Sequence, residues 1–129
     1  MRSPKDLKVL LAEDNVVNQR LMKLIFSKLK LNVDIASNGK IAFEMYQQKA
    51  YDLIFMDVQM PVMDGLESTK LIREFEQSSE TSHRALLIAL TGSELSENKD
   101  ICSECGMDDF IEKPIRAEKL HKYISRLTE

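Results

Sequence analysis

One stretch constrains the fold more than any other, an unbroken apolar run from Leu53 to Met56 that ends on the carboxylate of Asp57. Such a run is typical of a strand that is covered on both faces in a parallel sheet. Turn-forming residues follow at once, over positions 58–65. Because ligands of open α/β sheets bind at the carboxyl ends of the strands, Asp57 stands where a functional residue is expected. A loop-start or capping aspartate is the alternative interpretation.

Four further stretches have the composition of strands. Residues 9–12 and 85–90 are fully apolar, Phe110 begins a short strand, and residues 32–36 alternate polar and apolar side chains as an edge strand does. Segments with helical spacing of apolar residues separate these strands. Five strands alternating with five helices predict an α/β fold, a flavodoxin-like doubly wound parallel sheet in the strand order 2-1-3-4-5.

The sequence indicates some of the helices more strongly than others. Asn15 is the expected cap of the first helix, whose single apolar face contains Val17, Leu21, Leu24 and Ile25. The polar residues 76–84 predict a frayed helix end and a loop. A second helix is expected to contain Ile41, Ala42, Met45 and Tyr46, and a third to start near Asp64, with Glu67 in a capping box. A weak helix is expected over 94–105. The last helix uses Leu120, Ile124 and Leu127.

Length and composition describe one ordinary globular domain over residues 1–129. The chain is 43% hydrophobic and 30% charged, and its net charge of −3 gives no electrostatic affinity for nucleic acid or anionic lipid. No apolar run approaches the ~18 residues that a membrane span needs. The first five residues lack the apolar core of a signal peptide, so we expect a cytoplasmic domain that makes no membrane contact of its own.

Polar residues follow four of the predicted strands. They are Glu13 with Asp14, then Asp57, Thr91 and Lys113. Each has a separate explanation, such as a capping box for Thr91 over residues 91–94. However, the carboxyl ends of parallel strands meet at one edge of the sheet, where ligands bind. A shared site explains all four positions together.

The residue types at this edge favour one kind of chemistry. Three carboxylates in one crevice repel each other, and a hard divalent cation such as Mg2+ relieves that repulsion. No His or Cys follows these strands, which disfavours zinc or copper. A carboxylate beside Mg2+, with a lysine and a hydroxyl aimed at the same volume, fits phosphoryl transfer in which the carboxylate is the nucleophile.

Four motifs together identify a family resemblance. They are Leu11-Ala-Glu-Asp-Asn15, the segment from Met56 to Gly65 with its Asp57 and Pro61, Ala89-Leu-Thr91, and the segment from Gly106 to Pro114. In this order and spacing, over about residues 9–127, the chain resembles a receiver domain of a two-component response regulator. The residues of the first two motifs are most similar to those of receivers attached to hybrid sensor histidine kinases.

The resemblance implies a role for each residue of the site. Asp57 would be the phosphoacceptor, and Glu13, Asp14, Asp57 and the backbone carbonyl of Gln59 would hold Mg2+, for which Mn2+ is an expected substitute. Thr91 and Lys113 would bind the phosphoryl group, and Thr91 would act with the aromatic residue Phe110 as a conformational switch. A cis peptide bond between Lys113 and Pro114 is also expected.

The resemblance further implies the domain's partners. The phosphodonor would be a histidine kinase or a histidine phosphotransfer domain. The domain would catalyse its own phosphorylation and dephosphorylation without a classical enzyme activity. The chain could be a stand-alone regulator or an excised domain, including the cytoplasmic part of a membrane-bound hybrid kinase. Its oligomeric state stays open.

Two other functions are compatible with parts of the pattern. A haloacid dehalogenase-type phosphohydrolase also forms an aspartyl phosphate, but it usually carries a second Asp where this chain has Gln59, and it needs a cap domain. A flavin-binding electron carrier has the same fold. It would need a hydroxyl- and glycine-rich phosphate loop where this chain has Glu13 and Asp14, and flavin absorbance would reveal it.

Two smaller features have two interpretations each, and two residues depart from the family pattern. Cys102 and Cys105 could be a redox pair, but their spacing places them on one face of the weak helix with Leu95. The last helix carries a basic stripe, which is either a solvated face or a docking surface for an acidic partner. Gly92 and Arg116 depart from the family pattern and could loosen a loop and weaken a helix start. The basic stripe comprises Arg116, Lys119, Lys122 and Arg126.

Overall fold

The computed structural model describes residues 3–79, 83–92, 104–113 and 115–128. They form a five-stranded sheet in the order β2-β1-β3-β4-β5, with every neighbouring pair parallel, as predicted. The elements in chain order are a 3-10 turn at Pro4–Asp6, β1 (Val9–Ala12), α1 (Val16–Lys28), β2 (Val33–Ala36), α2 (Gly39–Gln48), β3 (Leu53–Asp57), α3 (Gly65–Ser78), β4 (Leu86–Thr91), β5 (Asp109–Glu112) and α6 (Ala117–Thr128).

The described residues contain four α-helices rather than the five predicted. The expected weak helix over 94–105 lies mostly outside the described residues, of which Glu104 and Cys105 are helical. The two strands at the centre of the prediction, β3 and β4, are buried along their whole length. The alternating strand β2 lies at the edge of the sheet and is half-buried, as its pattern predicted.

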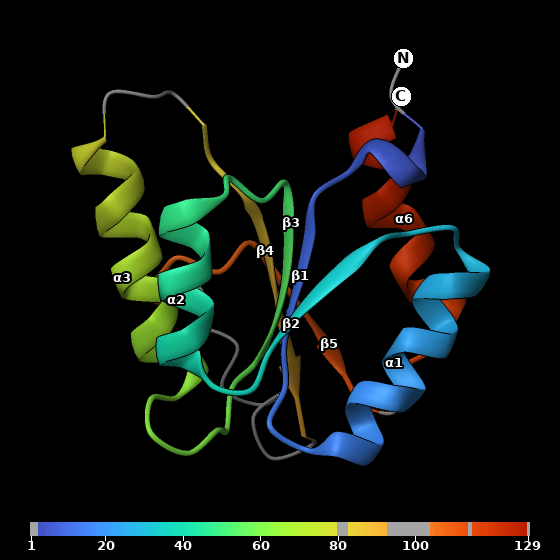
Figure 1. The fold of residues 1–129 in the computed structure, drawn as a ribbon, viewed down its shortest axis with the longest axis horizontal. Coiled ribbons are helices and arrows are strands. Elements are labelled where there is room, and N and C mark those ends of the chain that lie inside the picture. Colours follow the sequence, from blue (N-terminus) through green and yellow to red (C-terminus); the bar gives the residue numbers. More distant parts are fainter. Residues whose placement is uncertain (1–2, 80–82, 93–103, 114, 129) are drawn as a thin grey trace.

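Helices cover both faces of the sheet. Figure 1 shows α1 and α6 against one face and α2 and α3 against the other. Each face has its own apolar cluster because successive strand residues point to opposite sides. Leu11 and Phe55 belong to the cluster under α1 and α6, where the Phe55 ring stacks on Phe26 of α1 at 5.5 Å. Leu10 and Ile54 belong to the cluster under α2 and α3.

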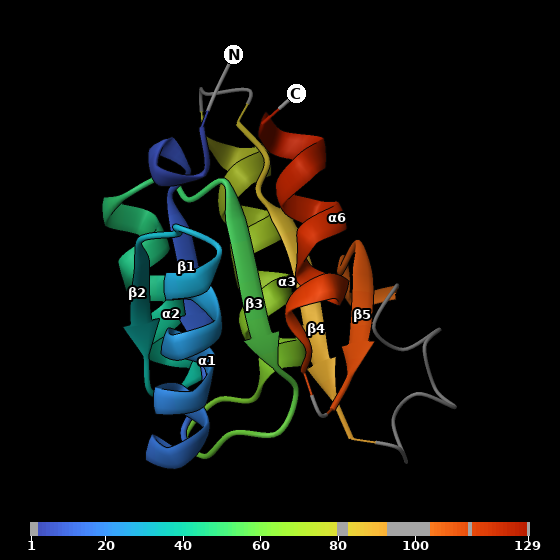
Figure 2. The ribbon, with the colours of Figure 1, turned by 90° about the vertical axis from the view of Figure 1, so that its right-hand side faces the viewer.

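The strand register brings the predicted site residues to one edge. Ala12 pairs with Met56, Asp57 with Leu90, and Thr91 with Glu112. Glu13 and Lys113 each follow directly after the last residue of a strand. The carboxyl ends therefore align, as Figure 2 shows for β3, β4 and β5.

Three helices begin at short polar side chains. The side chains of Asn15, Asn38 and Asp64 accept hydrogen bonds from backbone N–H groups three residues later, at 2.9–3.0 Å. These bonds satisfy donors that a helix start otherwise leaves unpaired. The caps predicted at Asn15 and Asp64 are confirmed, and they begin α1 and α3 directly after the loops that follow β1 and β3.

Most of the apolar face predicted for α1 does not pack on the sheet, the exception being Ile25, which is half-buried against the core. Met22 and Phe26 are the buried residues of this helix, whereas Val17, Leu21 and Leu24 lie 70%, 51% and 63% exposed. The helix has two apolar faces at the same spacing, and the sheet contacts the second one. The first face is left in solvent apart from Ile25.

Candidate functional site

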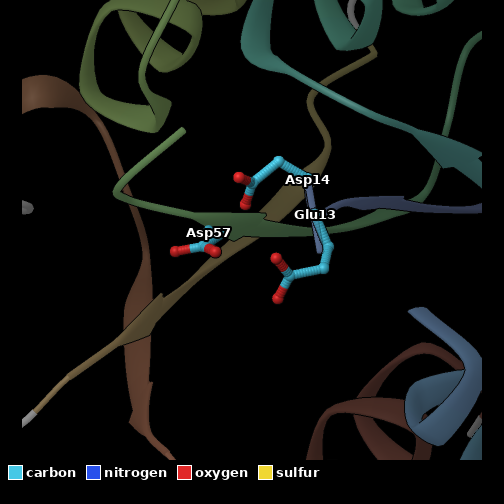
Figure 3. A group of neighbouring side chains, drawn as sticks. All are labelled: Glu13, Asp14 and Asp57. Atoms are coloured by element: carbon cyan, nitrogen blue, oxygen red, sulfur yellow. The ribbon is translucent and has the colours of Figure 1, made fainter. Parts of the chain in front are cut away.

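Three carboxylates meet at the carboxyl edge of the sheet. Glu13, Asp14 and Asp57 each offer an oxygen, and these oxygens lie within 4.8 Å of one another (Figure 3). Glu13 and Asp57 are buried and Asp14 is exposed, so the cluster opens to solvent on one side. The predicted acidic site is therefore assembled from the ends of β1 and β3.

Local hydrogen bonds fix these side chains. The backbone N–H of Gln59 donates to Asp57 Oδ1 at 3.2 Å, and the N–H of Asn15 donates to Glu13 Oε2 at 3.1 Å. The N–H of Gly65 donates to the carbonyl of Val58 at 3.0 Å and so closes the loop beside Asp57. A Cβ on Gly65 would collide with the Asp57 carbonyl oxygen, so only glycine fits this approach.

Lys113 supplies the cation of the site. Its Nζ lies 3.2 Å from Asp57 Oδ2 and 3.6 Å from Glu13 Oε1. Burial lowers the pKa of the Lys113 ammonium, but the charges of Asp57 and Glu13 raise that pKa by more, so the net pKa lies above its ordinary value. One ammonium thus faces three carboxylates.

Thr91 and Phe110 occupy the neighbouring strands. Thr91 is 1% exposed, and its hydroxyl is one of two buried side-chain polar atoms without a hydrogen-bond partner among the described residues, the other being that of Thr69. Such a buried hydroxyl typically costs about 1–3 kcal/mol. Thr91 follows Leu90, the residue paired with Asp57, so an oxygen bound beside Asp57 would meet an unused donor. Phe110 is half-buried against the cluster under α2 and α3.

The donor set fits a divalent cation that prefers oxygen ligands. Three carboxylates exceed the single Lys113 ammonium in charge, and all of the offered ligand atoms are oxygens. This is the chemistry that suits Mg2+. The expected contribution of the Gln59 carbonyl stays a prediction. The predicted Lys113–Pro114 cis bond falls on Pro114, which lies outside the described residues, as does Cys102.

The basic stripe of the last helix lies in solvent. Arg116, Lys119, Lys122 and Arg126 are exposed, and Lys122 lies 3.7 Å from Asp109 and over the ring of Tyr123. Cys105 is buried and is a free cysteine. Its burial agrees with a packing role.

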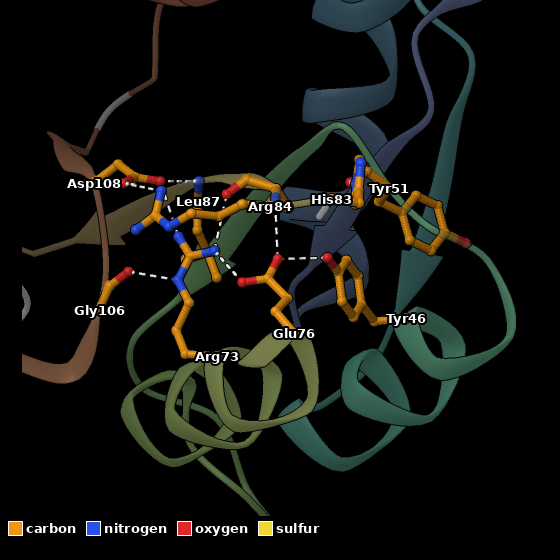
Figure 4. A network of polar contacts seen from close by, with 10 residues as sticks. Tyr46, Tyr51, Arg73, Glu76, His83, Arg84, Leu87, Gly106 and Asp108 are labelled. Atoms are coloured by element: carbon orange, nitrogen blue, oxygen red, sulfur yellow. Dashed lines mark hydrogen bonds and ion pairs between the residues drawn. The ribbon is translucent and has the colours of Figure 1, made fainter. Parts of the chain in front are cut away.

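A second polar cluster lies at the opposite edge of the sheet and was not foreseen from the sequence (Figure 4). Arg73 of α3 donates to Glu76 Oε1 at 2.8 Å, to Asp108 Oδ2 at 2.9 Å, and to the carbonyls of Gly106 and Ala85 at 2.8 and 2.9 Å. This arginine network joins α3 to the first residues of β4 and β5. The polar stretch that predicted a frayed end instead starts with an ordered Glu76 inside α3, because Arg73 and Tyr46 bind its carboxylate.

Glycine makes the arginine network possible. Gly106 has φ +105°, and a Cβ there would lie 2.7 Å from Cγ of Arg73. The sequence singled out Gly106 only as the first residue of the fourth motif, directly after the weak helix predicted over 94–105. A glycine three residues before β5 is the one sequence signal that a side chain, here that of Arg73, approaches the backbone closely at this point.

Comparison with known proteins agrees with this geometry. The family model for the response regulator receiver domain matches residues 9–125. Hybrid signal transduction histidine kinase K of Dictyostelium discoideum is 40% identical over 130 residues, which is 98% of this chain and 11% of that protein. Histidine kinase 5 of Arabidopsis thaliana is 34% identical over 141 residues, which is 92% of this chain and 15% of that protein. The chain thus spans a small part of both relatives.

Two solved structures are similar to the whole domain. The receiver domain of the Pseudomonas aeruginosa sensor histidine kinase PA1611, with a magnesium ion in its active-site cleft, has a TM-score of 0.80 and 32% identity and covers 93% of this chain and 95% of its own. The Saccharomyces cerevisiae receiver domain of Ssk1, co-crystallised with the histidine phosphotransfer protein Ypd1, has a TM-score of 0.83 and 34% identity over 97% and 90%.

The chain belongs to the response regulator receiver domains of two-component signalling. The predicted family, fold class and phosphorelay type of function are confirmed by this membership and by the structural similarity. In the described part of the chain, no helix combines the length and apolarity that crossing a membrane requires.

Proposed function

We propose that this chain accepts a phosphoryl group from a phosphohistidine onto Asp57 in a Mg2+-dependent reaction, and so acts as a signalling switch or relay. One observation carries the proposal. Asp57 lies in a carboxylate cluster whose ligand oxygens are within 4.8 Å of one another, and its own carboxylate is 3.2 Å from the Lys113 ammonium. A nucleophile, a metal site and a cation for phosphoryl oxygens coincide at one strand edge.

Glu13, Asp14 and Asp57 would hold the metal together with the Gln59 carbonyl, and the bound metal would neutralise charge on the phosphoryl oxygens. Because Mn2+ favours the same oxygen ligands, we expect it to substitute for Mg2+.

The chain's own residues perform the transfer step. A carboxylate oxygen of Asp57 forms a bond to phosphorus as the P–N bond of the phosphohistidine breaks, and the electron pair leaves with the imidazole nitrogen. The N–H of Gln59 orients the Asp57 carboxylate. The Lys113 ammonium neutralises one phosphoryl oxygen, and the unpaired Thr91 hydroxyl donates a hydrogen bond to another. Self-dephosphorylation would follow when a water oxygen forms a bond to phosphorus as the P–O bond to Asp57 breaks, which releases inorganic phosphate and a proton and restores the carboxylate.

Thr91 would also pass the signal onward. When its hydroxyl turns towards the phosphoryl group, it vacates space that the half-buried ring of Phe110 on β5 can enter. Two such states separated by a few kcal/mol form a switch. Beryllofluoride, a phosphoryl mimic, should change the amide spectra of residues 91–112, and it should change them much less in Thr91→Ala.

The phosphodonor would be a histidine kinase or a histidine phosphotransfer domain. The relatives are hybrid histidine kinases, and a similar receiver was crystallised with a histidine phosphotransfer protein. We expect no direct contact with nucleic acid at a net charge of −3. A cytoplasmic location is proposed because histidine kinases of this kind act on cytoplasmic receivers.

Phosphorylation by a small donor tests the function. Acetyl phosphate with Mg2+ should add one phosphoryl group to the intact protein, as measured by mass spectrometry, and a chelator should prevent the addition. Asp57→Asn should abolish it. Asp52→Asn is the matched control, because Asp52 lies directly before the first residue of the same strand and Asn keeps an acceptor for the Lys8 N–H. Undiminished labelling of Asp57→Asn would overturn the proposal.

A further inference from the structure

Gln19, near the start of α1, makes a hydrogen bond that none of the proposed transfer steps uses. Its side-chain Nε2 donates to the backbone carbonyl oxygen of Glu13 at 2.6 Å. A carbonyl oxygen only accepts hydrogen bonds, so the amide of Gln19 must present its NH2 group to Glu13 and not its own oxygen. Gln19 therefore binds the backbone of a residue that belongs to the acidic site.

The segment that follows β1 is held between β2 and α1. The N–H of Glu13 donates to the Ala36 carbonyl of β2 at 3.0 Å, and the Glu13 carbonyl accepts from Gln19. Glu13 is only 2% exposed, and a buried carbonyl needs a hydrogen-bond partner. The helix that supplies this partner is anchored, because Phe26 of α1 is buried and stacks on Phe55. The Gln19 amide thus ties the end of β1 to a fixed helix.

The carbonyl that Gln19 binds belongs to the peptide unit between Glu13 and Asp14. Because a peptide unit is planar, a constraint on its C=O direction constrains ψ of Glu13 and φ of Asp14 together. These two angles set the directions in which both side chains leave the backbone. Figure 3 shows the two side chains leaving consecutive positions, with their carboxylates close to that of Asp57.

Asp14 depends on this constraint more than Glu13 does. The Glu13 carboxylate is itself held, since the N–H of Asn15 donates to its Oε2 at 3.1 Å. Asp14 is exposed, and within the part of the chain that the structure describes its carboxylate has no hydrogen-bond or ion-pair partner. The backbone alone therefore places the Asp14 carboxylate within 4.8 Å of the ligand oxygens of Glu13 and Asp57.

We propose that Gln19 is a positioning residue of the acidic site, whose amide orients the peptide between Glu13 and Asp14 and so holds both carboxylates where they bind a divalent cation. This inference rests on the proposed function, which assigns Mg2+ to the three carboxylates. Loss of a group that orients metal ligands without touching the metal typically weakens metal binding by about ten- to a hundredfold. Because Gln19 acts through the backbone of its two ligands, we expect the lower end of this range.

The Mg2+ affinity of Gln19 variants tests the inference. The probe is Mg2+ alone, titrated into the protein and followed by the shifts of backbone amides in NMR spectra. Gln19→Met removes the donor but keeps an unbranched side chain of similar length and good helix propensity, and it should raise the Kd for Mg2+ about tenfold. Gln19→Asn keeps the amide on a side chain that is one methylene shorter and cannot reach the carbonyl, so it should raise the Kd similarly. Gln47→Met, the same substitution at an exposed position of α2, is the matched control and should leave the Kd unchanged.

A comparison of affinity, rate and stability separates a positioning role from a purely structural one. Labelling of Gln19→Met by acetyl phosphate should be slow at low Mg2+ and should recover when Mg2+ saturates the site, because the amide acts on Glu13 and Asp14 and not on the nucleophile Asp57. Urea denaturation without Mg2+ reports any structural contribution. A lower free energy of unfolding together with a wild-type Kd for Mg2+ would make Gln19 a structural residue and overturn the inference.

The outcomes also separate this inference from the function on which it rests. If the wild type binds Mg2+ but acetyl phosphate does not label it, the proposed function fails, and the Kd values still decide the role of Gln19. If the wild type is labelled normally and Gln19→Met binds Mg2+ as tightly as the wild type does, the positioning role alone is overturned. Gln19→Asn decides the matter if Gln19→Met does not fold, and a wild-type Kd in Gln19→Asn would overturn the role in the same way.

Discussion

The two edges of the sheet carry the same kinds of charged group in opposite arrangements. At the amino edge, Arg73 faces Glu76 and Asp108 and donates to both, and these carboxylates also accept from backbone N–H groups of Ala85 and Leu87. At the carboxyl edge, three carboxylates face Lys113, and the Thr91 hydroxyl has no partner within the described residues.

This difference separates a structural cluster from a functional one. Every charge of the arginine network has a compensating partner, so the network gains nothing from a ligand and holds α3 against β4 and β5. The acidic site has surplus negative charge and an unused donor, both of which a cation and a phosphoryl group would compensate. Charge balance distinguishes the two clusters where residue type does not.

Breaking the arginine network should have the largest effect on stability. Arg73→Leu leaves Glu76 and Asp108 without their buried partner, and removal of one member of a buried pair typically costs about 3–5 kcal/mol. Urea denaturation followed by circular dichroism measures the loss. Arg84→Ala is the control, because Arg84 binds the same Asp108 from an exposed position and an exposed pair contributes about 0–1 kcal/mol. Equal losses in the two variants would contradict the structural role of Arg73.

Mg2+ should stabilise the wild type through the acidic site. At a Mg2+ concentration about ten times its Kd, linkage predicts a gain of about 1.4 kcal/mol in the free energy of unfolding. Asp57→Asn and Asp14→Asn should lose most of this gain, and Asp57→Asn without Mg2+ should be no less stable than the wild type because it removes one repelling charge. The control Asp52→Asn should keep the full gain. Equal Mg2+ stabilisation of Asp57→Asn would place the metal elsewhere.

Lys113→Ala should slow phosphoryl transfer strongly and lower the stability of the fold only slightly. The Lys113 side chain is 34% exposed, and its removal leaves no cavity in the core. We therefore expect the free energy of unfolding to fall by less than about 1 kcal/mol, together with a large fall in the rate of labelling by acetyl phosphate. Lys122→Ala removes a more exposed lysine paired with Asp109 and should change neither quantity. A loss of several kcal/mol in Lys113→Ala would identify a structural lysine.

Alkaline pH should have the smallest effect on stability, through Tyr46, which binds Glu76 of the arginine network. Burial, and next the hydrogen bond to Glu76, raise the pKa of Tyr46 above its ordinary value of 10.0. The folded protein therefore keeps a proton that the unfolded chain releases, so this stability is present below pH ~10 and falls as pH rises further. Tyr46→Phe should flatten the fall in unfolding free energy without removing it, because Tyr51 and Tyr123 have raised pKa values too. An unchanged slope would contradict this assignment.

The sequence predicted the carboxyl edge well and the amino edge hardly at all. Glu13, Asp57 and Thr91 each follow an apolar run and Lys113 follows a short strand, so their positions can be read from local pattern once the strands are known to be parallel. Arg73 reaches Asp108, 35 positions away. No local pattern records such a pair, so neither residue was singled out.

The face of α1 that packs on the sheet was not predicted, for a related reason. Both the exposed face with Val17, Leu21 and Leu24 and the face with Met22 and Phe26 have helical spacing, and only contact with Phe55 of the sheet decides which is buried. A periodicity predicts that a helix has an apolar face but does not choose between two. The choice leaves the other apolar face beside the acidic site.

Chemical location of the phosphoryl group shows most directly whether Asp57 is the phosphoacceptor. After acetyl phosphate and Mg2+, borohydride reduces an aspartyl phosphate to homoserine, and peptide mass spectrometry then identifies the altered position. If Asp57 is the phosphoacceptor, homoserine should form at position 57, in the wild type and in Asp52→Asn, and none should form when Mg2+ is chelated. Homoserine at position 14 or 64 of the wild-type protein, or a Mg2+-independent yield at 57, would contradict this role of Asp57.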